Sequence, residues 1–85
     1  MQIFVRILSG KTISIDVNEN TLLFDILNYV NEYDDKNQYQ NLIITGEYYE
    51  EHPLVVEKNK ILDLNQRLIS LYKNKIIKEI VFLAI

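Results

Sequence analysis

The spacing of apolar residues changes near Asn18, and this change constrains the fold more than any other feature of the chain. Before it, Met1, Ile3 and Val5 alternate with Gln2 and Phe4, and a second alternating run covers residues 12–17. Alternation with a period of two is typical of half-buried strands. Gly10 lies in the intervening turn 8–11, where it supplies positive φ at no steric cost. We therefore expect a hairpin in which Phe4 points outward and the core face carries Ile3, Val5, Ile13, Ile15 and Val17.

The residues after the loop 18–21 follow a helical period instead. Thr21 is a residue type favoured at helix N-caps. We expect a helix over about 22–33, ended by residues 34–37. Its apolar stripe would comprise Leu22, Leu23, Ile26, Leu27 and Val30, with Asp25, Asn28 and Asn31 on the opposite side.

The pattern of the second half of the chain predicts two further strands, a possible short strand between them, and another helix. Residues 42–45 form a short apolar strand pattern, residues 48–49 a possible strand, and residues 76–85 a last strand rich in β-branched and aromatic side chains. Between them, residues 61–72 place Ile61, Leu64, Leu68, Leu71 and Tyr72 on one helical stripe. The order of elements indicates an α+β roll, in which a helix packs on a mixed sheet.

Composition excludes several classes of function. The 85 residues suffice for a single domain, 1–85, with no cysteine and one histidine. Disulfide scaffolds, thiolate chemistry and histidine metal cages are therefore not expected. The net charge of −3 provides no basic surface of the kind that binds nucleic acid or anionic membranes. Without a signal peptide pattern or a spanning apolar run, we expect a cytoplasmic or nuclear protein.

The N-terminal hairpin segment, MQIFVRILSGKTISIDV, resembles the first hairpin of ubiquitin without a gap. Thr21 resembles that family's helix cap, residues 40–46 resemble its third strand and turn, and residues 51–75 depart from it. The buried helix face is similar at Leu23, Ile26 and Val30. The resemblance implies a ubiquitin-like β-grasp fold: a mixed sheet of four to five strands, one main helix packed on it and, here, an extra helix before the last strand.

Two functions of the ubiquitin family follow from the resemblance, and the first is covalent attachment. That function uses a C-terminal diglycine on a flexible tail, whereas this sequence reads Ala84-Ile85 at its end. Glu47 stands at the position of the main chain-linking lysine and Arg6 at that of another, although Lys11 is kept. We therefore expect no conjugation.

The second function is recognition through an apolar surface patch. The resemblance implies contact residues at Leu8, Ile43, Val81 and Leu83, with Phe4 second. Ile43 points away from the core if its two neighbours point inward, and Val81 and Leu83 share one face of the last strand. The alternative is that these residues are core, or are covered by the second helix, and that Phe4 packs across the hairpin.

We expect a non-catalytic protein-interaction module that requires no cofactor, with ubiquitin-binding domains or components of the ubiquitin pathway as possible partners. One alternative is a homodimer formed through an exposed last strand or through helix 61–72. Another is a modifier matured from a longer precursor. No catalytic or metal constellation can be assembled from His52, Asp34-Asp35 and Glu50-Glu51, which fit solvated surface positions.

Overall fold

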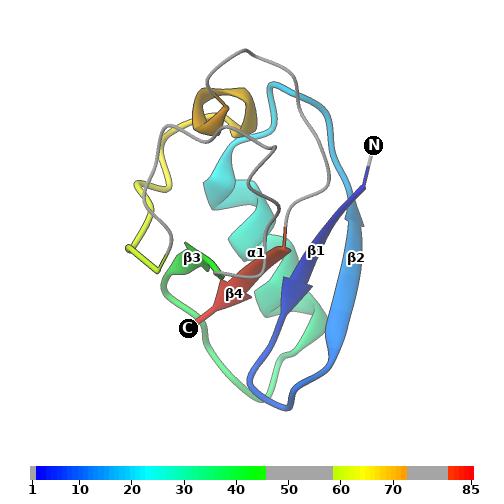
Figure 1. Cartoon of the computed structure of the whole chain (residues 1–85). Helices are drawn as coiled ribbons and strands as arrows, with labels where there is room; N and C mark the ends of the chain where they lie inside the picture. The colour runs from blue at the N-terminus through cyan, green and yellow to red at the C-terminus, as the bar shows by residue number, and fades with distance from the viewer. Residues whose placement is uncertain (1, 46–58, 73–80) are drawn as a thin grey trace.

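The computed structural model describes residues 2–45, 59–72 and 81–85, which form a small α+β fold with four strands and one α-helix (Figure 1). The expected turn and strand at 46–49, the loop around His52 and the first half of the predicted last strand lie outside these ranges. The elements are β1 (Gln2–Arg6), β2 (Thr12–Asp16), α1 (Leu23–Tyr33), β3 (Leu42–Ile44), a 3₁₀ helix η1 (Leu68–Leu71) and β4 (Val81–Ala84).

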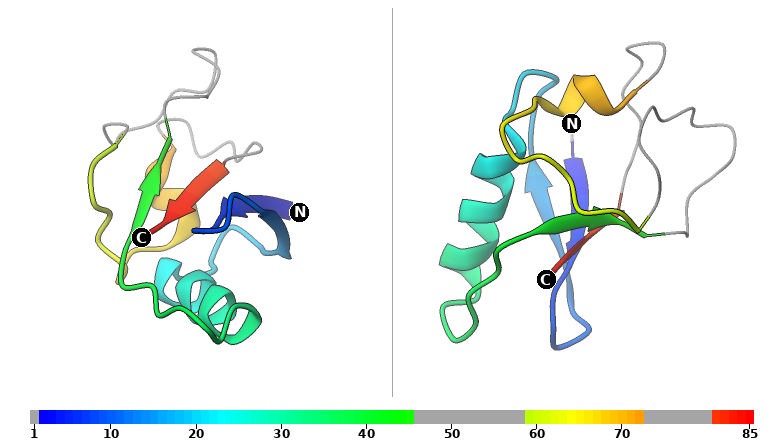
Figure 2. Two further views of the ribbon diagram at one scale, coloured as in Figure 1. Left: turned by 90° about the horizontal axis from the view of Figure 1, so that it is seen from below. Right: turned by 90° about the vertical axis from the view of Figure 1, so that its left-hand side faces the viewer.

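The four strands form a mixed sheet in the order β2-β1-β4-β3. β1 pairs antiparallel with β2 and parallel with β4, and β3 pairs antiparallel with β4. The helix α1 lies against one face of this sheet (Figure 2). This arrangement confirms the predicted α+β class with a mixed four-stranded sheet, and it is compatible with a β-grasp fold.

The core lies between α1 and the face of the sheet that α1 covers. As predicted, the alternating residues Ile3, Val5, Ile13, Ile15 and Val17 are buried, and so are the helix residues Leu23, Ile26, Leu27 and Val30. Ile7, Leu42, Ile44, Phe82 and Ala84 join the same core. The face of the sheet opposite α1 is called the outer face below.

The predicted N-cap of α1 is wrong. Leu22 occupies the cap position, and the Thr21 hydroxyl accepts a hydrogen bond from the Asn18 amide at 3.0 Å, within the preceding loop. The first helical amides donate instead to main-chain carbonyls: Leu23 N to Gln66 O and Phe24 N to Leu64 O, both at 3.0 Å. The first amides of a helix have no acceptors within the helix. These carbonyls therefore accept the hydrogen bonds that a side-chain cap was expected to accept.

The helix predicted over residues 61–72 does not form. Residues 61–67 are irregular, and only Leu68–Leu71 make a short 3₁₀ turn. The segment takes this conformation because its main chain is used elsewhere: two of its carbonyls cap α1, and the Asn59 and Leu62 amides donate to the Ile44 and Leu42 carbonyls of β3 at 2.8 and 3.0 Å. A continuous helix over 61–72 would have used the Leu64 and Gln66 carbonyls internally.

The last strand lies inside the sheet rather than at its edge. β4 is flanked by β1 on one side and β3 on the other, and its pairing with the β3 side continues to Ile85, which exchanges main-chain hydrogen bonds with Asn41. Among the described residues, no helix is both long and apolar enough to cross a bilayer.

Candidate protein-binding surface

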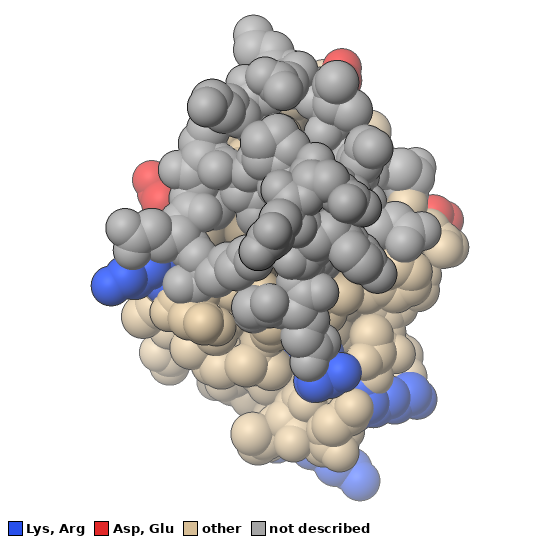
Figure 3. Space-filling view, viewed as in Figure 1, with Lys and Arg blue, Asp and Glu red and all other residues tan. Residues whose placement is uncertain are grey.

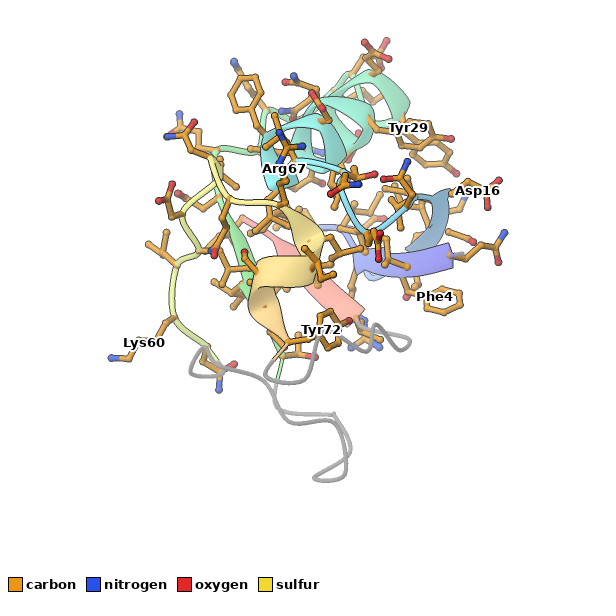
Figure 4. The ribbon with its side chains drawn as sticks, turned by 90° about the horizontal axis from the view of Figure 1, so that it is seen from above. Phe4, Asp16, Tyr29, Lys60, Arg67 and Tyr72 are labelled. Carbon is orange, nitrogen blue, oxygen red and sulfur yellow. The ribbon has the colours of Figure 1, made fainter. Side chains whose placement is uncertain are left out.

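Strand pairing places four of the five predicted contact residues in two neighbouring pairs. Phe4 of β1 lies opposite Val81 of β4, and Leu83 of β4 lies opposite Ile43 of β3. In each strand these residues alternate with buried ones, so all four are on the outer face. Figure 4 shows the Phe4 ring on the side of β1 that faces away from α1.

These four side chains are half-buried rather than core or fully exposed. Val81 also packs in part against the core. Directly opposite side chains on one face of a sheet are within contact range of each other. Phe4 lies opposite Ser14 across the hairpin and opposite Val81 on β4, and it is part of the same apolar row as Val81.

Leu8 lies beyond the paired residues, in the turn that follows β1. Its side chain is 73% exposed, the largest exposed fraction among the big apolar residues of the described chain. We call Leu8, Phe4, Ile43, Val81 and Leu83 the apolar surface. Ile85 adds to it: it continues the alternation of Val81 and Leu83 and is 47% exposed. That alternation was visible in the sequence, although Ile85 was not among the predicted contact residues.

A basic residue lies inside the apolar surface. Arg6 of β1 is opposite Leu83 on one side and Thr12 on the other, and it shares the outward alternation of Phe4. Figure 3 shows this face. Among the residues coloured by type, Lys and Arg lie around the lower half of the face, and Asp and Glu lie at its upper margins.

The segment 59–72 does not provide the helical cover that the alternative interpretation required. Its apolar side chains Leu62, Leu68, Leu71 and Tyr72 are buried in the core that α1 shares with the inner side of the sheet. Its hydrogen bonds run to β3 and to the N-terminal end of α1. Among the described residues, this segment forms no α-helix and β4 lies between two strands, while residues 76–80 of the predicted last strand lie outside the described ranges. The homodimer alternative therefore stays a prediction.

A tyrosine that the sequence analysis did not single out joins the Leu8 turn to the end of α1. Tyr39 is only 4% exposed, and its hydroxyl accepts a hydrogen bond from the Leu8 amide at 3.0 Å. The same hydroxyl donates to Asp34 Oδ2 at 2.7 Å. Asn31, expected on the solvent side of the helix, is half-buried and bonds both the amide and the carbonyl of Tyr39.

This network shifts two pKa values in opposite directions. Hydrogen bonds from Tyr39 and then Asn37 lower the pKa of Asp34, because they stabilise the carboxylate form. Burial is the main reason that the pKa of Tyr39 is raised, with the neighbouring Asp34 charge adding to it. Asp34 is therefore an acceptor within a structural network and is half-buried, rather than the solvated surface carboxylate expected from the sequence.

The described residues contain no group of three His, Cys, Asp or Glu side chains that could hold a metal ion. His52 and Glu50-Glu51 lie outside the described ranges. Scans of the chain against protein-family models and against curated proteins found no match.

Proposed function

We propose that this chain is a ubiquitin-like β-grasp domain that binds other proteins through the apolar surface and catalyses no reaction. The observation that carries the proposal is the adjacency of Phe4 with Val81 and of Ile43 with Leu83 on the outer face, none of them fully buried. The resemblance of the hairpin segment to ubiquitin supports the same surface. A cytoplasmic or nuclear location and a non-conjugated chain belong to this proposal.

The mechanism we propose is docking of an apolar helix or loop of the partner onto the half-exposed strand residues. Each apolar side chain that becomes fully buried contributes up to about 1.5–3 kcal/mol before the costs of association. For a small surface these costs leave a dissociation constant of roughly 1 μM to 1 mM.

The test compares two variants in which isoleucine becomes aspartate. Ile43→Asp places a charge in the apolar surface, whereas Ile61→Asp makes the same change at a residue that is 65% exposed in the segment 59–72. Each protein is immobilised, proteins captured from cell lysate are identified by mass spectrometry, and thermal unfolding verifies that both variants are folded. We expect ubiquitin-binding proteins to be retained by wild type and Ile61→Asp and lost from Ile43→Asp.

Three results would contradict the proposal. Retention of the same proteins by folded Ile43→Asp would show that the apolar surface is not the contact surface. Recovery of the chain alone, with a mass that doubles with concentration in light scattering, would favour the homodimer alternative instead. Native protein attached to targets, detected by its intact mass, would favour the modifier alternative.

A further inference from the structure

The Tyr39 side chain ties the turn that carries Leu8 to the segment after α1. Lys11 of the same turn also contacts α1, where its Nζ lies 5.1 Å from the centroid of the Tyr33 ring. Within the turn, Ile7 N donates to Lys11 O and Gly10 N donates to Ile7 O, both at 2.9 Å. The Leu8 amide instead donates to the Tyr39 hydroxyl at 3.0 Å, 31 residues away in the sequence. The Leu8 amide is thus directed toward Tyr39 while its side chain remains exposed.

Tyr39 is itself held in place from three directions. Its amide donates to Asn31 Oδ1 at 2.7 Å, and Asn31 Nδ2 donates to its carbonyl at 2.9 Å. Its hydroxyl donates to Asp34 Oδ2, which also accepts a hydrogen bond from Asn37 Nδ2 at 3.1 Å. The ring is buried, so the hydroxyl has a fixed place between the end of α1 and the β1–β2 turn, which lie at the same end of the molecule in Figures 1 and 2.

The directions of these hydrogen bonds are mutually consistent. A phenol has one proton to donate and lone pairs with which to accept. The ionised Asp34 carboxylate can only accept, so the phenol proton lies on the Asp34 side and a lone pair faces the Leu8 amide. Because an amide can only donate, Tyr39 satisfies both neighbours at once, and phenylalanine at this position would satisfy neither.

We propose that Tyr39 is a positioning residue for the binding surface: it latches the β1–β2 turn to the C-terminal end of α1 and thereby holds Leu8 in one place before a partner arrives. The consequence for binding rests on the function proposed above. A side chain held in its bound position loses less conformational freedom on binding, so the latch would raise affinity without touching the partner.

The experiment measures the turn itself, without a partner. Backbone ¹⁵N relaxation and amide hydrogen exchange are recorded for wild type, Tyr39→Phe and Tyr29→Phe. The last is a matched control, because Tyr29 is an exposed tyrosine of α1. We expect Tyr39→Phe to speed exchange of the Leu8 amide by about two- to tenfold relative to buried strand amides and to lower its order parameter. Tyr29→Phe should do neither.

A second variant keeps the latch testable if Tyr39→Phe does not fold. Asp34→Ala leaves the tyrosine ring in the core and removes the carboxylate that accepts from Tyr39 and Asn37. The Leu8 amide should then loosen less than in Tyr39→Phe but more than in the control. An unchanged Leu8 amide in a folded Tyr39→Phe variant, or in Asp34→Ala if Tyr39→Phe is unfolded, would overturn the proposal.

Lysate capture then separates the latch from the binding function. Loosening of Leu8 together with weaker capture supports both. Loosening with unchanged capture supports the positioning role of Tyr39 for the turn and overturns the assignment of Leu8 to the binding surface.

Discussion

The irregular conformation of segment 59–72 can be distinguished by mutation from the helix that the sequence predicted over 61–72. On the expected helical stripe, Ile61 faces the core and Leu62 does not. In the structure the reverse holds: Leu62 is 5% exposed and Ile61 is 65% exposed. Truncating each residue to alanine therefore tests which backbone conformation the chain adopts.

The expected magnitudes differ severalfold. Leu62→Ala removes a buried side chain that packs in the shared core, and such changes cost about 2–5 kcal/mol of unfolding free energy. Ile61→Ala removes a side chain that keeps most of its surface in water, so its cost should be below about 1 kcal/mol. A small domain has only about 5–15 kcal/mol of stability in total, so the first change is large and the second is minor.

Urea unfolding followed by circular dichroism measures both values. With a denaturant slope of about 1–3 kcal/mol per molar urea for a small protein, Leu62→Ala should lower the midpoint by about 1 M or more, and Ile61→Ala should barely move it. Leu68→Ala is a positive control, because Leu68 is fully buried in the structure and lies on the stripe in the helical interpretation as well. Equal costs for Leu62 and Ile61, or a larger cost for Ile61, would refute the reasoning.

Two further predictions concern the ends of elements. The pKa of Asp34 is lowered in the folded state, so its ionised carboxylate stabilises the fold at pH values above its ordinary pKa of 3.8. This contribution to the free energy of unfolding is lost as the pH falls through the lowered pKa. Asp34→Asn should therefore show a smaller decrease of the unfolding midpoint between about pH 4 and pH 2 than wild type, and an identical decrease would contradict this. Gly10 has φ +90 and open space around its Cβ position, so Gly10→Ala should cost about 1–2 kcal/mol through backbone strain alone, and Gly10→Asn less. Thermal unfolding of the two variants distinguishes strain from steric clash.

The spacing of apolar residues predicted the β1–β2 hairpin and α1, whose hydrogen bonds lie within the helix or between neighbouring alternating strands. The five core-face residues of the hairpin and the residues Leu23, Ile26, Leu27 and Val30 of α1 were correct because each is a direct reading of a period of 2 or 3.6. Leu22, also expected on the buried stripe, is half-buried at the cap position instead. The outward orientation of Ile43 and Leu83 followed from the same rule. Which of these residues become neighbours did not follow from it, because register and strand order are tertiary properties.

The errors over residues 61–72 and at Thr21 have one physical cause, which is competition for main-chain hydrogen bonds. The stripe over 61–72 fits a helix, yet the carbonyls of Leu64 and Gln66 stabilise the start of α1 instead. The Thr21 hydroxyl has a partner in its own loop. Tyr39 was missed because six tyrosines and many asparagines in one chain make any single one uninformative by composition. Only its position, buried between a turn and a helix end, distinguishes it.

The outer face itself argues for a contact surface on one half of the sheet. A sheet with one solvated face normally presents polar side chains there. β2 follows this rule with Thr12, Ser14 and Asp16, all exposed. The outward positions of β3 and β4 do not follow it, because Ile43, Val81 and Leu83 are apolar and half-buried. Random surface variation would scatter such residues over all four strands. Their concentration on adjacent strands, with Phe4 alongside, supports the contact surface proposed above, where a partner would replace water.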